Sequence, residues 1–323
     1  MFAVAAFAMS AAMFSADAAS AGEIAVEKHD GGAKVTIDGK LFADYLIKTG
    51  PKPIVWPIIG PTGKEMTRAF PMRFTVGEKP DHPHHRSLWF THGNVNGIDF
   101  WSEPSLAKQV HREYLKCEAD GKQAVIGAVN DWIDPKGKKQ CEDVRTLTFR
   151  DGGDARSIDF DITIKASDGP VKFGDTKEGS MGVRVPTALD LTQLDKKKTG
   201  GNIVNANGIR DKETWGKAAP WVDYHGKLDD EMVGIAMLNH PSSFRYPTYW
   251  HVRDYGLFAA NPFGLHDFTQ ANEHEGDYTL PAGETVTFRY RVLFHKGDEQ
   301  QAKLAEAFEA YSREQPADAE AKK

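Results

Sequence analysis

The chain has 323 residues, of which 27 % are charged and 40 % hydrophobic, and its formal net charge at pH 7 is −6. This mild acidity gives no reason to expect nucleic acid or an anionic membrane as a partner, because both bind proteins through positive charge. The length is sufficient for a large hydrophobic core, either in two domains or in one large β architecture. After the first residues no stretch is apolar enough to span a bilayer, so we expect no membrane insertion of the mature chain.

The chain begins with small and apolar residues, 1–21, that include neither Lys nor Arg. Two Ala-x-Ala sites, at residues 16–18 and 19–21, are typical of signal-peptidase cleavage. A membrane anchor is the alternative, but the stretch is short for a span and contains Asp17. The pattern predicts a signal peptide over residues 1–21 and a periplasmic or secreted location, although the usual positive charge at the start is missing.

Most of the remaining chain has the patterns of β-strands. Apolar and polar residues alternate with period two in several runs, as expected of half-buried strands, and Asp-Gly turns separate the runs nearest the N-terminus. Residues 110–117 fit either a helix or a strand, and we favour a strand because strand-like runs flank them. The other predicted strands include Ile24–His29, Ala33–Ile37, Leu41–Ile47, Ser157–Ser167 and Thr285–His295.

One helix is predicted near the C-terminus, over residues 298–313, because Leu304, Phe308 and Tyr311 recur at helical spacing. The polar residues 315–323 beyond it are expected to be a frayed tail. No linker rich in Pro, Gly or Ser and no internal repeat divides the rest of the chain. We therefore expect an all-β fold, a single large β-sandwich domain over residues 22–314 with one C-terminal helix.

The chain has two cysteines, Cys117 and Cys141. An exported protein matures where disulfides persist, but the sequence does not give the geometry that a bridge requires. Neither cysteine lies in a motif with metal-ligand spacing. A disulfide and two buried thiols therefore both remain open.

Four of the twelve histidines fall within eleven residues, at positions 82, 84, 85 and 92. Imidazole changes its protonation near neutral pH and binds metal ions, so the cluster fits proton transfer or metal ligation. In an extended segment His82 and His84 face one way and His85 the other, and no further motif completes a ligand set. Our first hypothesis is proton transfer or substrate contact by His85 and His92. A metal ion on His82 and His84, or histidines that only hydrogen-bond to loops, are the alternatives, and no cofactor is predicted.

A second polar segment, residues 173–185, places Asp175, Lys177 and Glu178 between glycines and Arg184 within an apolar strand pattern. A solvated charged turn would have the same composition. If the segment instead faces the histidine cluster, Asp175 or Glu178 can act as a base and Arg184 can anchor polar groups.

A third segment, residues 246–264, combines aromatic, cationic and amide side chains. Aromatic faces stack on the apolar side of a sugar ring, while Arg and Asn bind its hydroxyls. Core packing is the alternative for Trp250. The residues of interest here are Trp250, His251, Arg253, Tyr255 and Asn261.

These segments resemble the PmoA-like family, whose members were once labelled methane oxygenase subunits and are now treated as a domain of unknown function. The resemblance rests on HPHHRSLWFTHGNVNGIDFW at 82–101, DTKEG at 175–179, WGKAAPWVDYHG at 215–226 and HPSSFRYPTYWHVRDYGLFAANPFG at 240–264. It implies an exported, β-rich protein of carbohydrate-processing bacteria. The methane label fits poorly, because a membrane oxygenase subunit would need several spanning helices.

A weaker likeness runs to the aldose mutarotase-like supersandwich proteins, through His92-Gly93 followed by the aromatic Trp101. Those enzymes use a histidine as acid and a carboxylate as base across a sugar ring. The likeness implies a galactose mutarotase-like β-supersandwich, with His92 or His251 as the acid and Asp175 or Glu178 as the base.

The sequence thus favours an exported carbohydrate-active enzyme that performs isomerisation, elimination or hydrolysis on a carbohydrate or glycoside by acid/base chemistry. A noncatalytic glycan-binding protein and a metal-dependent oxidase or hydrolase are the alternatives. The predicted catalytic residues are His85, His92, Asp175, Glu178 and His251, and the predicted substrate-binding residues are Trp89, Trp101, Lys177, Arg184, Trp250, Arg253, Tyr255 and Asn261.

Overall fold

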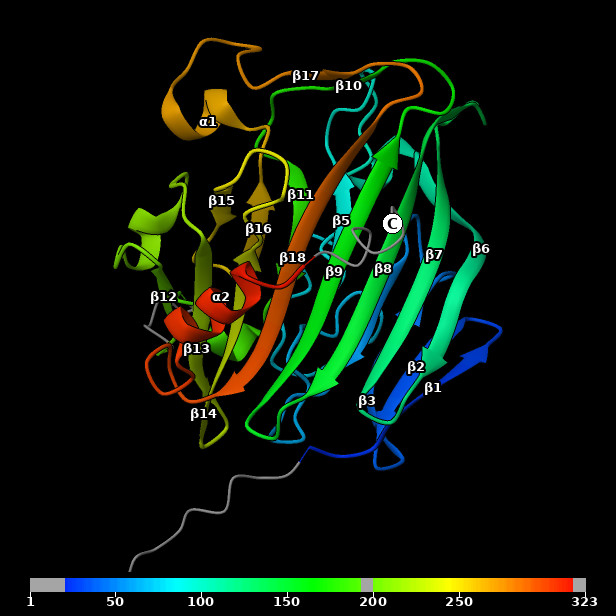
Figure 1. Cartoon of the computed structure of the whole chain (residues 1–323). Helices are drawn as coiled ribbons and strands as arrows, with labels where there is room; N and C mark the ends of the chain where they lie inside the picture. The colour runs from blue at the N-terminus through cyan, green and yellow to red at the C-terminus, as the bar shows by residue number, and fades with distance from the viewer. Residues whose placement is uncertain (1–20, 193–199, 316–323) are drawn as a thin grey trace, which may run out of the picture.

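The computed structural model describes residues 21–192 and 200–315 (Figure 1). Two eight-stranded antiparallel sheets pack face to face, and the described helices are short. The predicted all-β sandwich with a helix near the C-terminus is therefore confirmed. The predicted signal peptide, apart from Ala21, and the predicted tail, apart from Gln315, lie outside the described residues.

Sheet 1 has the strand order β1-β2-β3-β4-β5-β11-β16-β15. Its first three strands are the strands predicted nearest the N-terminus, and the strands that follow come from distant parts of the chain. The bounds are β1 Ile24–His29, β2 Gly32–Ile37, β3 Lys40–Leu46, β4 Ile54–Ile58, β5 Leu88–His92, β11 Gly179–Arg184, β15 Tyr249–Val252 and β16 Leu257–Asn261.

Sheet 2 has the order β12-β13-β14-β18-β9-β8-β7-β6. The ambiguous segment at 110–117 lies within a strand, as predicted. The bounds are β6 Lys108–Ala119, β7 Gln123–Ile133, β8 Lys139–Asp151, β9 Ala155–Lys165, β12 Asn202–Asn205, β13 Trp221–Leu228, β14 Glu231–Asn239 and β18 Thr285–Lys296.

The remaining elements are short, and β10, β17 and α1 lie at one end of the sandwich (Figure 1). A two-stranded ribbon pairs β10 with β17, and single 3-10 turns interrupt three loops. The bounds are β10 Val171–Phe173, β17 Tyr278–Leu280, α1 Leu265–Thr269, α2 Leu304–Ser312, and the 3-10 turns η1 Glu103–Ser105, η2 Thr187–Leu189 and η3 Asp211–Thr214.

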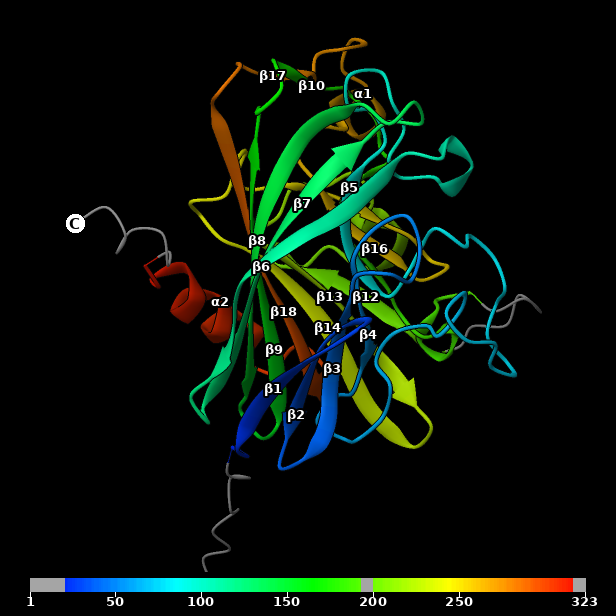
Figure 2. The same ribbon diagram turned by 90° about the vertical axis from the view of Figure 1, so that its right-hand side faces the viewer.

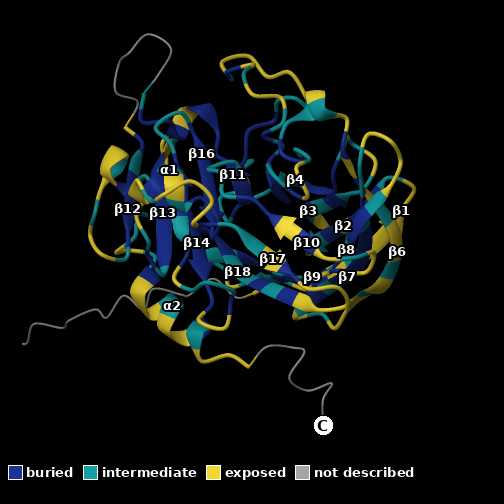
Figure 3. Ribbon diagram, turned by 90° about the horizontal axis from the view of Figure 1, so that it is seen from above, coloured by how far each residue is buried: buried dark blue, intermediate teal, exposed yellow. Residues whose placement is uncertain are grey.

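The main hydrophobic core lies between the two sheets, where Figure 3 shows most of the fully buried chain. Period-two alternation sends every second side chain of a strand into this layer. In β9, for example, Phe160, Ile162 and Ile164 belong to the core. The register of the strands therefore fixes which polar side chains remain on the outer faces.

A smaller apolar cluster lies on the other face of sheet 1 and contains Ile54, Trp89, Trp101, Leu257 and Ala259. Side chains of one parity in β4, β5 and β16 supply four of these residues. Long loops before β5 and after it cover this face. Because these loops carry the histidine segment, the cluster forms the base of the candidate site.

The C-terminal helix α2 covers the outer face of sheet 2 (Figure 2). Its buried residues Leu304 and Tyr311 pack against Trp221, Leu238 and Leu293. The helix begins six residues later than predicted, because turns precede it from residue 299. Among the described residues no helix is long and apolar enough to cross a membrane.

The structure also places the two cysteines. Cys117 is half-buried on β6, Cys141 is buried on β8, and both are free thiols. Burial raises the pKa of the Cys141 thiol well above its usual range. The second of the two alternatives for the cysteines, unpaired thiols, is therefore the one the structure shows.

Candidate functional site

Polar and aromatic side chains gather on the outer face of sheet 1. They come from the loops that precede β4 and β5, from β5 and β11, and from the loops that follow β5 and β15. We call them the outer-face group: Lys52, Arg68, Asp81, His82, His84, His85, Trp89, Trp101, Arg184 and Tyr255.

Four rings of this group form a stack. The Trp89 indole lies over β11, where the opposite residue is Gly182. A Cβ at Gly182 would lie 2.5 Å from Trp89 Cζ2, so the indole requires a glycine there. His85 stacks on Trp89 with ring centroids 5.6 Å apart, and His82 stacks on His85 at 4.9 Å. Tyr255 stacks on His82 at 5.1 Å and completes the stack.

Two buried arginines hold the loop beneath the stack. Arg68 and Arg184 both donate to Asp81 Oδ1, the Arg184 bond measuring 2.8 Å. Burial acts to raise the pKa of Asp81, but the charges of Arg184 and Arg68 outweigh it and lower that pKa. Asp81 is therefore an ionised anchor for two side chains from distant strands and loops.

The contact with Arg184 decides which ring nitrogen of His85 carries the proton. Arg184 Nη1 lies 3.1 Å from His85 Nδ1, and a guanidinium can only donate, so Nδ1 accepts. Burial, followed by the charges of His84 and Arg184, lowers the pKa of His85 well below its usual value. The neutral ring must then carry its proton on Nε2. His85 thus offers the site a neutral hydrogen-bond donor.

Lys52 lies beside these rings and is almost fully buried. Its Nζ donates to the Trp101 carbonyl oxygen at 3.2 Å and lies 5.8 Å from the centre of the Trp89 ring. Burial lowers its pKa to about 7. Burial, together with the charge of Lys52, lowers the pKa of His84 to about 4. Both groups can therefore lack a proton near neutral pH.

Glu178 is the carboxyl group closest in character to a general base. It lies in the loop before β11, and burial raises its pKa. Among the described residues its carboxylate accepts no hydrogen bond, and Lys177 Nζ lies 3.9 Å from its Oε1. The charges of Asp99 and Arg253 also act on it. A partly buried carboxylate with a raised pKa and free lone pairs is suited to proton transfer.

His92, by contrast, faces the core between the sheets. Its Nε2 lies 2.9 Å from the Gly174 carbonyl oxygen, and its ring packs 4.8 Å from that of Phe263. Burial lowers the pKa of His92 to about 4. Trp250 also lies in the core and donates from Nε1 to the Ala219 carbonyl oxygen at 2.9 Å.

The structure also places Asp175 away from the outer-face group. Its Oδ2 accepts hydrogen bonds from the backbone N–H groups of Gly276, at 2.8 Å, and His266, at 3.1 Å. These bonds connect the segment before β11 to the loop that contains α1.

Two predicted residues hold the backbone next to Glu178. His251 Nδ1 donates to the Lys177 carbonyl oxygen at 2.8 Å, and Asn261 Nδ2 donates to that of Thr176 at 2.8 Å. Burial lowers the pKa of His251 to about 4, so its ring is neutral. His251 and Asn261 are thus placed to position the Glu178 segment.

A pocket of about 280 Å³ adjoins this region and is lined by Lys212, Trp215, Val252, Arg253 and Asp254. We call it the Arg253 pocket. The Arg253 guanidinium lies over the Tyr255 ring, 5.5 Å from its centre. Within the described residues it makes no hydrogen bond or ion pair. The pocket therefore borders the outer-face group at Tyr255 and offers an unused cation.

Some of these residues carry no clear signal in the sequence. Lys52 lies between two prolines, far along the chain from any histidine, and Arg68 lies in a loop without a motif. The one sequence signal for Lys52 is that it is a single charged residue just before an apolar strand. Glu178, Arg184, Arg253 and Tyr255 were predicted, and the structure brings them to one side of sheet 1.

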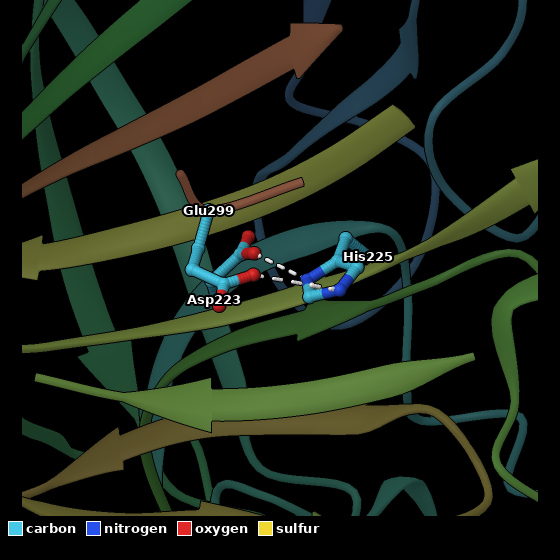
Figure 4. A group of neighbouring side chains, drawn as sticks. All are labelled: Asp223, His225 and Glu299. Carbon is cyan, nitrogen blue, oxygen red and sulfur yellow. Dashed lines mark hydrogen bonds and ion pairs between the residues drawn. The ribbon is translucent and has the colours of Figure 1, made fainter. Parts of the chain in front are cut away.

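A second cluster of titratable groups lies on the outer face of sheet 2 (Figure 4). Asp223, His225 and Glu299 are the only described group of three residues whose side chains could hold one metal ion. His225 Nδ1 lies 2.7 Å from Asp223 Oδ2, and its Nε2 lies 3.6 Å from Glu299 Oε2. His295 Nε2 lies 3.0 Å from Asp223 Oδ1, and Arg210 pairs with Glu299 at 2.7 Å.

One imidazole with carboxylates is a donor set that metal ions accept, and a carboxylate on Nδ1 is a common outer-shell arrangement at such sites. Here, however, each carboxylate already has cationic or imidazole partners. The cluster is thus complete as a set of ion pairs between sheet 2 and the segment before α2. His82 and His84 lie together in the outer-face group, with ring centroids 5.8 Å apart, and do not belong to a described group of three such ligands.

The comparison with known proteins identifies a family for this chain but assigns it no activity. The sequence model of a family described as "Family of unknown function (DUF6807)" matches residues 32–309. None of the curated proteins matches the sequence.

Solved structures give distant likenesses. A galactose mutarotase related enzyme from Lactobacillus acidophilus is 10 % identical with a TM-score of 0.38, over 84 % of this chain and 97 % of that one. A galactose mutarotase-like protein from Lactobacillus casei is 8 % identical with a TM-score of 0.37, over 84 % and 100 %. An α-galactosidase of family GH36 from Geobacillus stearothermophilus is 13 % identical with a TM-score of 0.39, over 86 % and 39 %. The chain thus spans less than half of that galactosidase, and likenesses at this level assign neither a function nor a substrate.

Proposed function

The chain belongs to the family described as "Family of unknown function (DUF6807)", and from its side chains we propose that it is a carbohydrate-active enzyme working by acid/base chemistry at the outer-face group. With the predicted signal peptide, it would act in the periplasm or outside the cell. The observation that carries the proposal is Glu178, a carboxyl group with a raised pKa and no hydrogen bond within the described chain.

Glu178 is proposed as the base. Burial holds its pKa above the usual value, which brings the group closer to the pH at which it must take up a proton. The backbone bonds from His251 and Asn261 to residues 176 and 177 fix the loop that carries it. In this scheme His251 and Asn261 position the base rather than touch the sugar.

Neutral imidazoles are proposed as the hydrogen-bond donors. His85 presents Nε2–H because Arg184 occupies its Nδ1, and His84 is neutral because its pKa lies at about 4. Donors that stay neutral can polarise a sugar oxygen without requiring protonation first. Buried His92 and Asp175, bonded to the backbone, are proposed to be structural.

Tyr255 is proposed to meet the sugar at its ring edge, because His82 and the guanidinium groups of Arg184 and Arg253 already lie over its faces. It is partly exposed, whereas Trp89 and Trp101 are buried beneath His85 and Trp250 lies in the core. Trp89 and Trp101 then support the stack from below instead of binding substrate. This scheme assigns contact with the substrate to the rim of the group and rigidity to its base.

The proposal is tested with Glu178→Gln in a panel of oligosaccharides and glycosides, with products followed by mass spectrometry. The variant should lose at least about 100-fold in turnover, the usual contribution of a general base, while keeping its melting temperature. Glu306→Gln, on the exposed side of α2, is the matched control and should match wild type. Full activity of Glu178→Gln would overturn the proposed role, and binding of sugars by wild type without any product would favour a glycan-binding protein.

A further inference from the structure

The Arg253 pocket combines an unmatched positive charge with an aromatic wall. We infer that it binds the carboxylate of an acidic sugar, a uronic acid residue, next to Glu178. This inference rests on the proposed function, because it names the substrate class of that same site.

The charges of the pocket do not cancel. Lys212 Nζ pairs with Asp254 Oδ2 at 2.9 Å, and Asp254 also accepts from Thr192 Oγ1 at 3.2 Å. Asp254 is therefore used by partners other than Arg253. The Arg253 guanidinium has no hydrogen bond or ion pair in the described parts of the chain, so the lining keeps one net positive charge. An anionic group would complete it.

The Arg253 guanidinium is also held in place. It lies over the Tyr255 ring at 5.5 Å, and the Arg184 guanidinium lies over the same ring at 5.2 Å. Contact with an aromatic face restrains a guanidinium but leaves its N–H groups free. A restrained planar fork matches the two oxygens of a carboxylate.

The aromatic wall argues for a sugar rather than a simple anion. Trp215 is half-buried and packs edge-on against Phe268, with ring centroids 5.4 Å apart, and against His251 at 6.5 Å. Its buried Nε1 has no hydrogen-bond partner in the described structure. The pocket thus offers an aromatic wall beside the cation, which suits a pyranose with a carboxylate.

Arg253 also connects the pocket with the proposed base, since its charge acts on the carboxyl of Glu178. A uronic acid held by Arg253 would bring its ring beside Tyr255 and Glu178. A neutral sugar would leave the guanidinium unpaired and lose that interaction.

The test is isothermal titration of the full chain with sodium glucuronate and sodium galacturonate. Glucose and galactose are the neutral comparisons, and inorganic phosphate is the comparison anion. We expect the uronates to bind at least about tenfold more tightly than either neutral sugar, the effect of one charge-assisted pair, and the preference to weaken as salt is added.

Arg253→Met should reduce uronate affinity about tenfold or more and change the affinity for neutral sugars by much less. Arg253→Lys, which keeps the charge but not the fork, should recover only part of the loss. Arg313→Met, at an exposed position beyond α2, removes the same charge elsewhere and should bind as wild type. Thermal melting of each variant checks that the chain is folded.

The outcomes separate the two proposals. Equal affinity for uronates and neutral sugars, or phosphate binding as tight as uronate binding, overturns the uronate inference and leaves the proposed enzyme standing. If sugar turnover is lost in Glu178→Gln but unchanged in Arg253→Met, the uronate inference is likewise overturned and the proposed enzyme stands. If no sugar binds at all, the proposed function fails and the inference fails with it.

Discussion

At the scale of single residues, the candidate site depends on one missing side chain. Gly182 faces outward from β11 directly opposite Trp89, and the space that a Cβ would take is filled by the indole. Because Trp89 supports His85, and His85 supports His82, the position of the imidazoles follows from a glycine that has no chemistry of its own.

Gly182→Ala should therefore displace the stack. We expect it to lower the free energy of unfolding by about 1–3 kcal/mol, the cost of overpacking a tight site, and to reduce turnover of whatever sugar the enzyme accepts. Urea denaturation and steady-state rates check both effects. Gly31→Ala, where the nearest contacts are atoms of the His29 ring at 3.2 Å or more, should have a smaller effect. If the two variants are equally stable and active, Trp89 does not need that space.

At the scale of elements, local patterns predicted the strands well. The alternation in residues 157–167 and 285–295 corresponds to β9 and β18, which pair with each other. The helix α1 was missed because a five-residue helix gives less than two turns of periodicity. The helix α2 was predicted to begin too early, because the turns before it have the same apolar spacing as a helix.

The candidate site was less predictable than the strands for a physical reason. Its loops are held by long-range bonds, such as those of Arg68 and Arg184 to Asp81, which leave no period in the sequence. Strand parity was the wrong guide for residues 82–85 of the histidine cluster, which form a turn closed by a hydrogen bond from the His85 N–H to the His82 carbonyl oxygen. That turn brings His82 and His85 face to face.

The helix α2 makes a prediction at this scale. Leu304 is buried under it, against the outer face of sheet 2, while the outer-face group lies on the other sheet. Leu304→Ala should cost about 2–4 kcal/mol of stability by leaving a cavity, without changing kcat or KM for any substrate found. Glu306→Ala, on the exposed side of the same helix, should change neither quantity. A loss of activity in a folded Leu304→Ala chain would show that α2 reaches the site.

At the scale of the whole molecule, the fold lowers the pKa values of several histidines and raises those of two others. Burial lowers the pKa values of His84, His92 and His251 to about 4, and that of His85 lies well below its usual range. Burial also acts to lower the pKa values of His225 and His295, but bonding to Asp223 outweighs it and raises both. The two sets therefore respond to pH in opposite directions.

The raised pair stabilises the fold below about pH 6.5, the ordinary histidine pKa, and that contribution is lost as pH rises through the higher folded values. The lowered histidines work the other way. Between about pH 6.5 and 4 these histidines bind protons in the unfolded chain but not in the folded chain, so the free energy of unfolding falls as pH falls. Burial also lowers the pKa values of His111 and His240. The six lowered histidines outnumber the two raised ones, and we expect the protein to lose stability steadily on acidification through this window.

His92→Gln tests this balance with one group, because His92 is fully buried and its titration is removed without adding charge. The variant will be less stable than wild type at pH 7, since the amide replaces a packed ring, but its stability should fall less on acidification. Between pH 6.5 and 4.5 the free energy of unfolding should fall by about 2 kcal/mol less in the variant than in wild type. Urea denaturation across that range measures it, with the exposed His274→Gln as control. Parallel pH profiles for His92→Gln and wild type would mean that His92 takes up its proton in the folded chain as readily as in the unfolded one.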